Sequence, residues 1–304
     1  MARRRRGCVV SSATPGGSRA DRRYGRFVND VIGHFNGRIL VIAPHMDDEA
    51  LACGGLIALL PDKQRIHVAY ATDGMKSPAP VFPGRDSISP DLGAVRRTES
   101  EAAMRMLGVP LANLCFFNLP EGQLHNHRGD LARRVREHLR RVQPHHVLVP
   151  FRFDRHPDHL AVNRAVTEAV LDGEYGGRVE EYFVYHRWRL LPRKDIRRYV
   201  RPEGLLKLDI TGVAALKRAA LDCFRTQTTR YYPWQTRPIL TPELLDEECR
   251  NPEYFLRYDA SRPGKEVFTS ASTWIRVAHR VEPKLQQWKY VVKTAWQRAT
   301  GTAR

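Results

Sequence analysis

The chain of 304 residues lacks long apolar segments, has few cysteines and is poor in acidic residues. No apolar run approaches the roughly 18 residues that a membrane-spanning helix needs. The five cysteines are scattered without a C-x-x-C spacing, which argues against a disulfide framework and favours a reducing compartment. The first residues carry charge as a signal peptide does, but residues 7–17 lack its apolar core. We therefore expect a cytoplasmic protein.

Basic residues are in clear excess, because 50 Lys and Arg face 33 Asp and Glu and give a net charge of +17. Residues 1–27 hold eight arginines and one aspartate and are predicted to form a disordered basic arm. The remaining excess is compatible with a solvated surface or with an anionic partner. Residues 187–201 alternate basic and aromatic side chains with no recognised nucleic-acid fold around them. We expect an anionic-ligand rim there and no specific nucleic acid.

The chain is organised around one predicted corner between a strand and a helix. The apolar run at residues 39–43 predicts a strand buried on both faces. Four ionisable residues follow it: His45, Asp47, Asp48 and Glu49. Residues 49–60 have the composition of a helix. Because ligands of open α/β sheets bind beyond the carboxyl ends of the strands, this corner is the candidate site.

A second polar cluster, residues 154–159, follows another apolar strand at residues 146–151 and again precedes a helical pattern. One such cluster would usually be a helix cap with a solvated histidine. Two clusters at equivalent positions bring histidines and aspartates to one edge of the sheet, where these side chains can bind zinc. The pair therefore predicts a metal site.

The two clusters carry a family resemblance. Residues 44–49, Pro-His-Met-Asp-Asp-Glu, and residues 156–159, His-Pro-Asp-His, resemble the signature of the PIG-L/LmbE-like family. That family consists of zinc-dependent de-N-acetylases acting on N-acetylglucosamine-type sugars. The resemblance covers roughly residues 38–230, with Met46 standing where a proline is more usual.

The resemblance implies a metal site and a catalytic base. It makes His45, Asp48 and His159 the ligands of Zn²⁺, or of Fe²⁺, which can use the same donors. Three protein ligands leave a position for water, whose pKa zinc lowers to about 7. Asp47 is then the general base that activates the metal-bound water.

Two further catalytic roles follow from the same resemblance. His156 would donate to the developing oxyanion, and Asp158 would orient a histidine. The proton for the departing amine could come from Asp47 or from His156, and the sequence leaves both open.

Three residues are candidates for binding the substrate. Arg96, at the start of a predicted helix, could bind a hydroxyl or a phosphate, or could form a surface pair with Glu99. Asp73 precedes a glycine and could bind a sugar hydroxyl, orient a ligand or simply form a turn. Glu121 lies on a third loop at the same edge of the sheet.

The predicted fold is α/β, a Rossmann-like mostly parallel sheet with helices on both faces. We expect a basic arm at residues 1–27, a deacetylase domain at residues 28–230, and an extension at residues 231–304. The extension combines an aromatic-rich pocket cover with a C-terminal basic amphipathic helix. A proline-rich loop at residues 75–93 is interpreted as a lid over the site.

The C-terminal helix has two alternative interpretations. Five apolar residues fall on one helical stripe: Leu285, Trp288, Val292, Ala295 and Trp296. Lysines lie off the stripe, as in helices that rest on membranes. The stripe would either dock onto the core of the protein or contact an anionic membrane.

The expected function is a zinc-dependent hydrolase that removes an N-acetyl or N-acyl group from an amino sugar or glycoconjugate. The identity of the substrate is left open, and the sugar could be lipid-linked or nucleotide-linked. The alternative is a non-catalytic protein of the same fold that binds an anionic ligand or a membrane. The presence of Asp47 and His156 favours the enzyme, because a pure binding site needs no positioned base.

Overall fold

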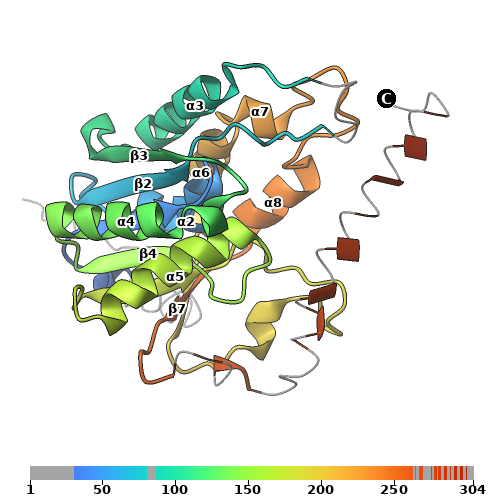
Figure 1. Ribbon diagram of the computed structural model, residues 1–304. Coiled ribbons are helices and arrows are strands. Elements are labelled where there is room, and N and C mark those ends of the chain that lie inside the picture. Colours follow the sequence, from blue (N-terminus) through green and yellow to red (C-terminus); the bar gives the residue numbers. More distant parts are fainter. Residues whose placement is uncertain are drawn as a thin grey trace, which may run out of the picture.

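The computed structural model describes residues 31–80 and 87–262, residues 264 and 267–269, and separate positions between residues 275 and 299. The expected arm at residues 1–27 lies outside the described residues. Within them, seven strands form one sheet in the order β3-β2-β1-β4-β5-β7-β6 (Figure 1). The strands are β1 (Ile39–Ala43), β2 (Ile66–Thr72), β3 (Leu114–Leu119), β4 (His146–Pro150), β5 (Arg178–Tyr182), β6 (Leu205–Leu208) and β7 (Glu253–Arg257).

The strands β1 to β5 pair in parallel, as expected when helices connect successive strands. The strand β7 runs antiparallel to both β5 and β6 at one edge. The predicted Rossmann-like, mostly parallel sheet is therefore confirmed. Because β7 lies between β5 and β6, the sheet extends across the boundary expected between residues 230 and 231.

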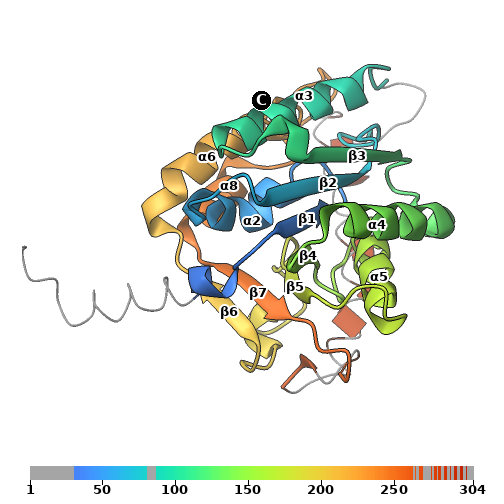
Figure 2. The same ribbon diagram turned by 90° about the vertical axis from the view of Figure 1, so that its left-hand side faces the viewer.

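Helices cover both faces of the sheet (Figures 1 and 2). The longer helices are α2 (Asp48–Leu59), α3 (Leu92–Met106), α4 (Arg128–Val142), α5 (Pro157–Leu171), α6 (Ala214–Leu221), α7 (Arg225–Thr228) and α8 (Pro242–Arg250). Short 3-10 turns are η1 (Leu111–Asn113), η2 (Leu124–Asn126), η3 (Ile196–Tyr199) and η4 (Thr211–Val213). The helices α4 and α5 pack together on one face, while α2, α3, α6 and α8 pack on the other. In the described part of the chain, no helix combines the length and apolarity needed to span a bilayer.

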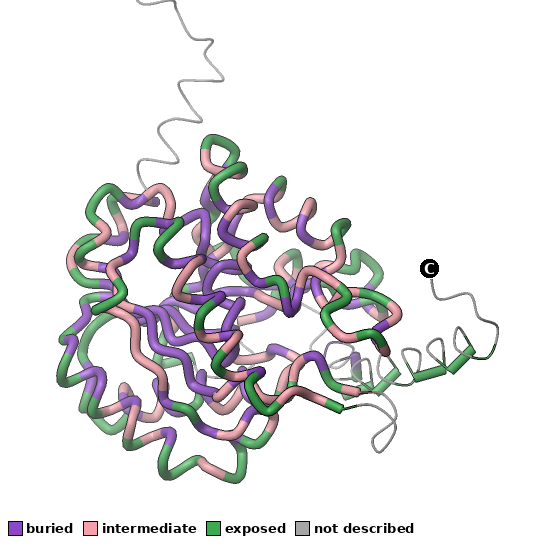
Figure 3. Tube along the Cα trace, turned by 90° about the horizontal axis from the view of Figure 1, so that it is seen from above, coloured by how far each residue is buried: buried purple, intermediate pink, exposed green. Residues whose placement is uncertain are grey.

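The central strand shows why the corner after it is fixed. All five residues of β1 are buried, and they alternate between two cores. Leu40 and Ile42 pack on the side of α4 and α5, whereas Ile39, Val41 and Ala43 face α2. A strand held on both faces gives the residues that follow it a rigid support. Figure 3 shows this buried interior beneath a more exposed shell of helices.

A third, smaller core lies beside the sheet. Its buried members include Phe151, Trp188, Ile196 and Phe268. Ile275 and Ala278 of the C-terminal helix are buried in the same cluster. This core holds the segment that follows β5, and with it the start of the C-terminal helix.

The apolar stripe of the C-terminal helix does not dock on the described part of the protein core. All five residues of the stripe are exposed, and Trp288 has 63 % and Trp296 61 % of its surface accessible. Figures 1 and 3 show these positions lying away from the sheet and its covering helices.

Candidate active site

A cavity of about 120 Å³ lies beyond the carboxyl ends of the central strands. Its lining contains six of the residues predicted for the site, namely His45, Asp47, Asp48, Arg96, Glu121 and His156. Tyr185, Gln227 and Glu248 complete its polar lining together with Ser77. The two clusters at the ends of β1 and β4 are thus brought to one place.

Three donor atoms converge at the floor of this cavity. His159 Nε2 lies 3.2 Å from His45 Nδ1 and 3.3 Å from Asp48 Oδ2, and His45 Nδ1 lies 3.2 Å from the same oxygen. All three side chains are buried. Ligands arranged tetrahedrally around Zn²⁺ at 2.0–2.1 Å would lie about 3.3 Å apart. The spacing therefore fits a divalent cation.

The second nitrogen of each histidine faces a carboxylate. His45 Nε2 lies 3.1 Å from Asp158 Oδ2, and His159 Nδ1 lies 3.2 Å from Asp154 Oδ1. Histidines that bind metals usually donate their other N–H to such a group, which fixes the ring and its tautomer. The arrangement leaves the two remaining nitrogens free to point at one ion.

Asp158 also joins the site to a neighbouring loop. Its carboxylate accepts hydrogen bonds from the backbone N–H groups of Gly122, at 2.6 Å, and Leu124, at 3.1 Å. Burial would raise the pKa of Asp158, but the hydrogen bond and charge of His45, with smaller effects of His156 and the Gly122 N–H, lower it to about 2. Asp158 therefore lies behind His45, where it can orient the ring, and does not line the cavity.

Two histidines of the site have their pKa values shifted in opposite directions. Burial would lower the pKa of His159, but Asp48 and Asp154 outweigh it and raise the pKa to about 9. Burial, together with repulsion from His45 and His159, lowers the pKa of His156 to about 3. His156 is therefore neutral over the physiological pH range.

Asp47 lies next to Asp48 but points into the cavity. Its carboxylate is 3.9 Å from the Arg96 guanidinium. Burial and the neighbouring charge of Asp48 raise the pKa of Asp47 to about 7, against the opposing effect of Arg96. A carboxylate in this position has the reach and the basicity of a general base.

His156 begins α5 and faces the three donors from the side. Its Nδ1 accepts a hydrogen bond of 3.2 Å from the backbone N–H of Asp158, so Nε2 is the ring atom left for the cavity. One nitrogen from each of His45, His156 and His159 lies within 4.8 Å of the others. The donor atoms of His45, Asp48 and His159 lie closer together, at 3.2 to 3.3 Å, than this limit for the three histidines.

The candidate substrate residues lie at different depths. The Arg96 side chain is only 1 % exposed and donates to Glu121 at 3.2 Å and to the Met46 carbonyl at 3.1 Å. The surface pair with Glu99 does not form, because Glu99 accepts hydrogen bonds from Thr226 instead. Arg96 is turned inward by the carboxylates of the cavity.

Asp73 supports the cavity from outside its lining. Its carboxylate accepts from the backbone N–H groups of Met75, at 3.1 Å, and Glu121, at 3.2 Å. It therefore acts as a turn residue that positions the loop of Glu121, one of the roles considered from the sequence.

The expected aromatic cover is arranged differently from the prediction. Ile239, Leu240 and Leu244 line the cavity, while Tyr232 and Trp234 stack on each other at 5.1 Å. These two rings bind the loop at residues 87–89, since Tyr232 Oη accepts from Ser89 N and Trp234 Nε1 donates to the Ser87 carbonyl. The aromatic side chains thus fix part of the expected lid, and aliphatic side chains cover the cavity. The tip of that lid, residues 81–86, lies outside the described residues.

Three residues of the site were not assigned roles from the sequence. Asp154 lies five positions before His159 in the same cluster, and its position after β4 was a usable signal. Tyr185 follows β5 at the same edge of the sheet, so the parallel topology could have indicated it. Glu248 comes from α8, which carries no recognisable motif.

A second group of metal-binding side chains lies at the opposite edge of the sheet. Glu180 Oε1 is 2.8 Å from His34 Nε2 and 3.0 Å from His146 Nδ1. These are the distances of direct hydrogen bonds, shorter than the spacing in the cavity. We interpret this group as a buried carboxylate paired with two histidines.

The fold and site define an α/β protein with a histidine and carboxylate centre of metal-binding type at its strand ends. Residues 40–170 match the family model described as PIG-L, GlcNAc-PI de-N-acetylase. The predicted resemblance to the PIG-L/LmbE-like family is therefore confirmed over these residues, which contain both motifs.

One curated relative is a probable N-acetyl-alpha-D-glucosaminyl L-malate deacetylase 2 from Bacillus cereus. It is 32% identical over 139 residues, which make up 43% of this chain and 60% of the relative. The match thus spans less than two thirds of that relative.

Solved structures share the fold. An N,N'-diacetylchitobiose deacetylase from Pyrococcus horikoshii has a TM-score of 0.53 and 19% sequence identity, covering 82% of this chain and 96% of that one. A zinc-inhibited form of the teicoplanin deacetylase Orf2 has a TM-score of 0.53 and 17% identity, covering 72% and 97%. At these identities the likeness establishes the fold alone.

Proposed function

We propose that this protein is a metal-dependent N-deacetylase that removes the acetyl group from an N-acetylated amino sugar. The observation that carries the proposal is the triangle of His45 Nδ1, Asp48 Oδ2 and His159 Nε2, with sides of 3.2 to 3.3 Å. The family membership and the amino-sugar substrate named for the curated relative support the same reaction.

His45, Asp48 and His159 would hold the cation, which we propose to be Zn²⁺, with Fe²⁺ as the alternative for the same donors. When bound, the cation supplies Lewis-acid chemistry, polarising the amide carbonyl and lowering the pKa of water. His156 lies outside this set of ligands and stays available to the substrate.

Asp47 acts as the general base of the reaction. It takes a proton from the water whose oxygen attacks the acetyl carbon, while neutral His156 donates a hydrogen bond to the carbonyl oxygen. The bond between carbon and nitrogen then breaks, and Asp47 or His156 delivers a proton to the departing amine. The products are acetate and a free amino sugar.

Arg96 and Glu121 bind the substrate from the wall of the cavity. Their mutual salt bridge fixes both side chains, so hydroxyl groups of the sugar meet a rigid surface with both donors and acceptors. Asp73 contributes indirectly by holding the backbone of Glu121.

The test measures acetate release and metal content together. We expect Asp47→Asn to retain the metal of the wild type and to lose roughly 10²- to 10⁴-fold in kcat. The exposed Asp62→Asn, in the loop between α2 and β2, is the matched control and keeps full activity. A fully metal-loaded wild type that releases no acetate from any N-acetylated sugar would favour the alternative of a non-catalytic binding protein.

We propose in addition that the C-terminal helix contacts an anionic membrane. Its apolar stripe is exposed, and the chain carries a net charge of +17. Interfacial helices combine these two properties, with tryptophans at the level of the headgroups.

A further inference from the structure

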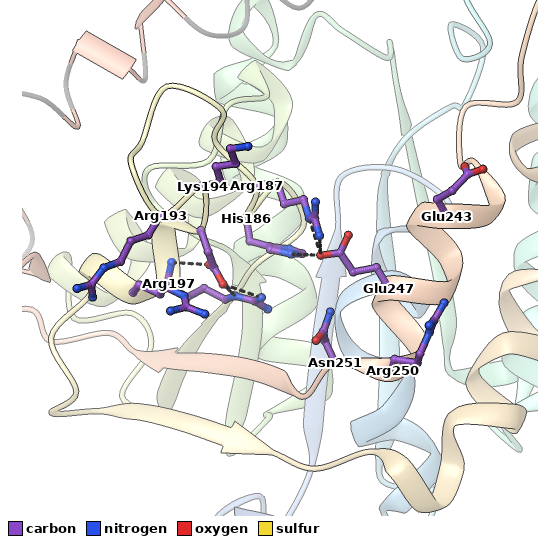
Figure 4. A pocket seen from close by; sticks show the side chains of 11 residues that line it. His186, Arg187, Arg193, Lys194, Arg197, Glu243, Glu247, Arg250 and Asn251 are labelled. Carbon is purple, nitrogen blue, oxygen red and sulfur yellow. Dashed lines mark hydrogen bonds and ion pairs between the residues drawn. The ribbon is translucent and has the colours of Figure 1, made fainter.

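A second and larger cavity, of about 710 Å³, adjoins the candidate active site. It lies between the segment that follows β5, residues 186–198, and the helix α8 (Figure 4). Small-molecule sites usually occupy about 300–1,000 Å³. The larger cavity falls in this range, whereas the catalytic cavity, at about 120 Å³, is too small for a whole sugar conjugate. Most of such a substrate must therefore lie outside the catalytic cavity.

The larger cavity is basic. Its lining has six Lys and Arg residues and three Asp and Glu residues. Arg187 is neutralised by Glu247, Arg197 by Asp195 at 3.0 Å, and Arg250 by Asp246 at 3.1 Å. Among the described residues, no carboxylate pairs with the remaining three, which are Arg193, Lys194 and Arg198. Figure 4 shows Arg193 and Lys194 at the rim, across from α8.

The backbone that carries these cations is fixed. Trp188 N donates to the Lys194 carbonyl at 2.8 Å, and Ile196 N donates to the His186 carbonyl at 3.0 Å, which closes a hairpin-like loop. Trp188 is fully buried and Ile196 nearly so. The positive charges are therefore presented by an anchored loop, so little conformational entropy is lost when an anion binds.

His186 lies at the inner end of the cavity. It is 3 % exposed, and neither ring nitrogen has a hydrogen-bond partner among the described residues. Burial and the nearby Arg197 lower its pKa to about 3, so the ring is neutral and one nitrogen carries a proton. Its two nitrogens face the carboxylates of Glu248 and Glu247, so the ring is not counted among the groups that would bind an anion.

The two cavities share a wall. Tyr185 lines the catalytic cavity, and the next residue, His186, lines the larger one. On α8, Glu248 lines the catalytic cavity and Glu247 lines the larger one. His186 lies 3.5 Å from Glu248 and 3.9 Å from Glu247. The basic loop therefore lies directly beside the wall that Tyr185 and Glu248 contribute to the catalytic cavity.

We propose that the larger cavity binds a phosphate group carried by the substrate whose acetamido group occupies the catalytic cavity. This inference rests on the proposed function and specifies its substrate class. Phosphate suits the lining because the three exposed cations without a partner outnumber the one remaining carboxylate, Glu243, by two charges. Guanidinium groups also bind phosphate oxygens in pairs. The phosphate belongs to a nucleotide or to a lipid headgroup linked to the sugar.

The test compares the metal-loaded wild type with Arg193→Gln/Lys194→Gln/Arg198→Gln. Its control, Arg105→Gln/Arg178→Gln/Lys207→Gln, removes the same charge from exposed positions elsewhere. We expect the wild type to prefer phosphate-linked N-acetylglucosamine over neutral N-acetylglucosamine in kcat/KM. The triple variant of the cavity should lose roughly tenfold or more of this preference, and the control should keep it. A preference that is absent, or equal in both variants, overturns the inference.

Nucleotide-linked and lipid-linked substrates are tested in parallel, and the better one identifies the source of the phosphate. Calorimetric binding of N-acetylglucosamine 1-phosphate, relative to N-acetylglucosamine, is measured on the same proteins. If no acetate is released from any substrate, the proposed function fails. The calorimetric preference and its loss in the triple variant then still decide whether the cavity binds phosphate.

Discussion

His45 Nδ1 and His159 Nε2 face each other at 3.2 Å, although the two residues are 114 positions apart in the chain. Each ring is held from behind by a different carboxylate, Asp158 for His45 and Asp154 for His159. Two electron-rich nitrogens fixed at this distance, with Asp48 beside them, form a site that a cation would stabilise.

The first prediction concerns the ligands of that cation. We expect about one Zn²⁺ per chain in the wild type and loss of most of it in His159→Ala or Asp48→Ala, because a structured site with two ligands binds zinc far more weakly. His156→Ala should retain the metal. Elemental analysis after dialysis against a chelator measures this, and an equal loss in His156→Ala would instead favour a site made of three histidines.

The corner after β1 could be predicted because local sequence determines it. An apolar run of five residues that ends at Pro44 is too short for a typical helix and favours a strand buried on both faces. The ionisable residues that follow it then lie at its end. The same reasoning placed residues 154–159 at the equivalent position. Parallel topology then brought the two clusters together without further information.

Other parts of the site depend on contacts between distant segments and have no local signal. Arg96 was spaced to pair with Glu99 on the same helix, but the carboxylate of Glu121 and the Met46 carbonyl draw it inward. The strands β6 and β7 were not predicted, since four or five residues of mixed polarity resemble a loop. Glu248 reaches the cavity only because α8 packs there.

The second prediction concerns a buried ion pair that joins β7 to two helices. Lys217 Nζ lies 2.9 Å from Glu253 Oε1, and Glu253 also accepts from the backbone N–H groups of Gly55 and Leu56. Lys217→Met leaves a buried carboxylate without its cation and should lower the free energy of unfolding by about 3–5 kcal/mol. Urea denaturation measures the change.

Two controls accompany this measurement. Lys217→Met/Glu253→Gln should be less destabilised than Lys217→Met, because the charge is removed and an amide oxygen still accepts a backbone N–H. Arg133→Met, which breaks exposed pairs with Asp130 and Glu137, should leave the free energy of unfolding close to that of the wild type, because solvent screens these pairs. A double variant that is as unstable as the single one would show that the unpaired charge is not the cause.

The third prediction is a dependence of stability on pH. His138 in α4 is buried beside Arg141, and burial together with that charge lowers its pKa to about 4. The unfolded chain therefore binds a proton below about pH 6.5 that the folded chain binds only near pH 4, so stability falls as the pH falls through this window. Between pH 7 and pH 5 the loss from this group is roughly 2 kcal/mol.

Replacing the titrating group should remove this loss. We expect His138→Leu to show a smaller decrease in unfolding free energy between pH 7 and pH 5 than the wild type, whereas the exposed His125→Gln should follow the wild type. Urea titrations of the three proteins at the two pH values give the six free energies of unfolding. An unchanged pH dependence in His138→Leu would mean that His138 is protonated in the folded protein as readily as in the unfolded one.

The last prediction tests the proposed membrane contact of the C-terminal helix. Trp288→Ser/Trp296→Ser removes the two most exposed aromatic side chains of the stripe and should reduce flotation of the full chain with anionic vesicles roughly tenfold. Met106→Ser/Leu171→Ser removes two exposed apolar side chains from other helices and should float as the wild type does. Binding should also weaken at high salt, because the attraction of a basic chain to anionic lipid is screened. Equal flotation of the tryptophan variant and the wild type would leave the basic surface, and not the helix, as the part that meets the membrane.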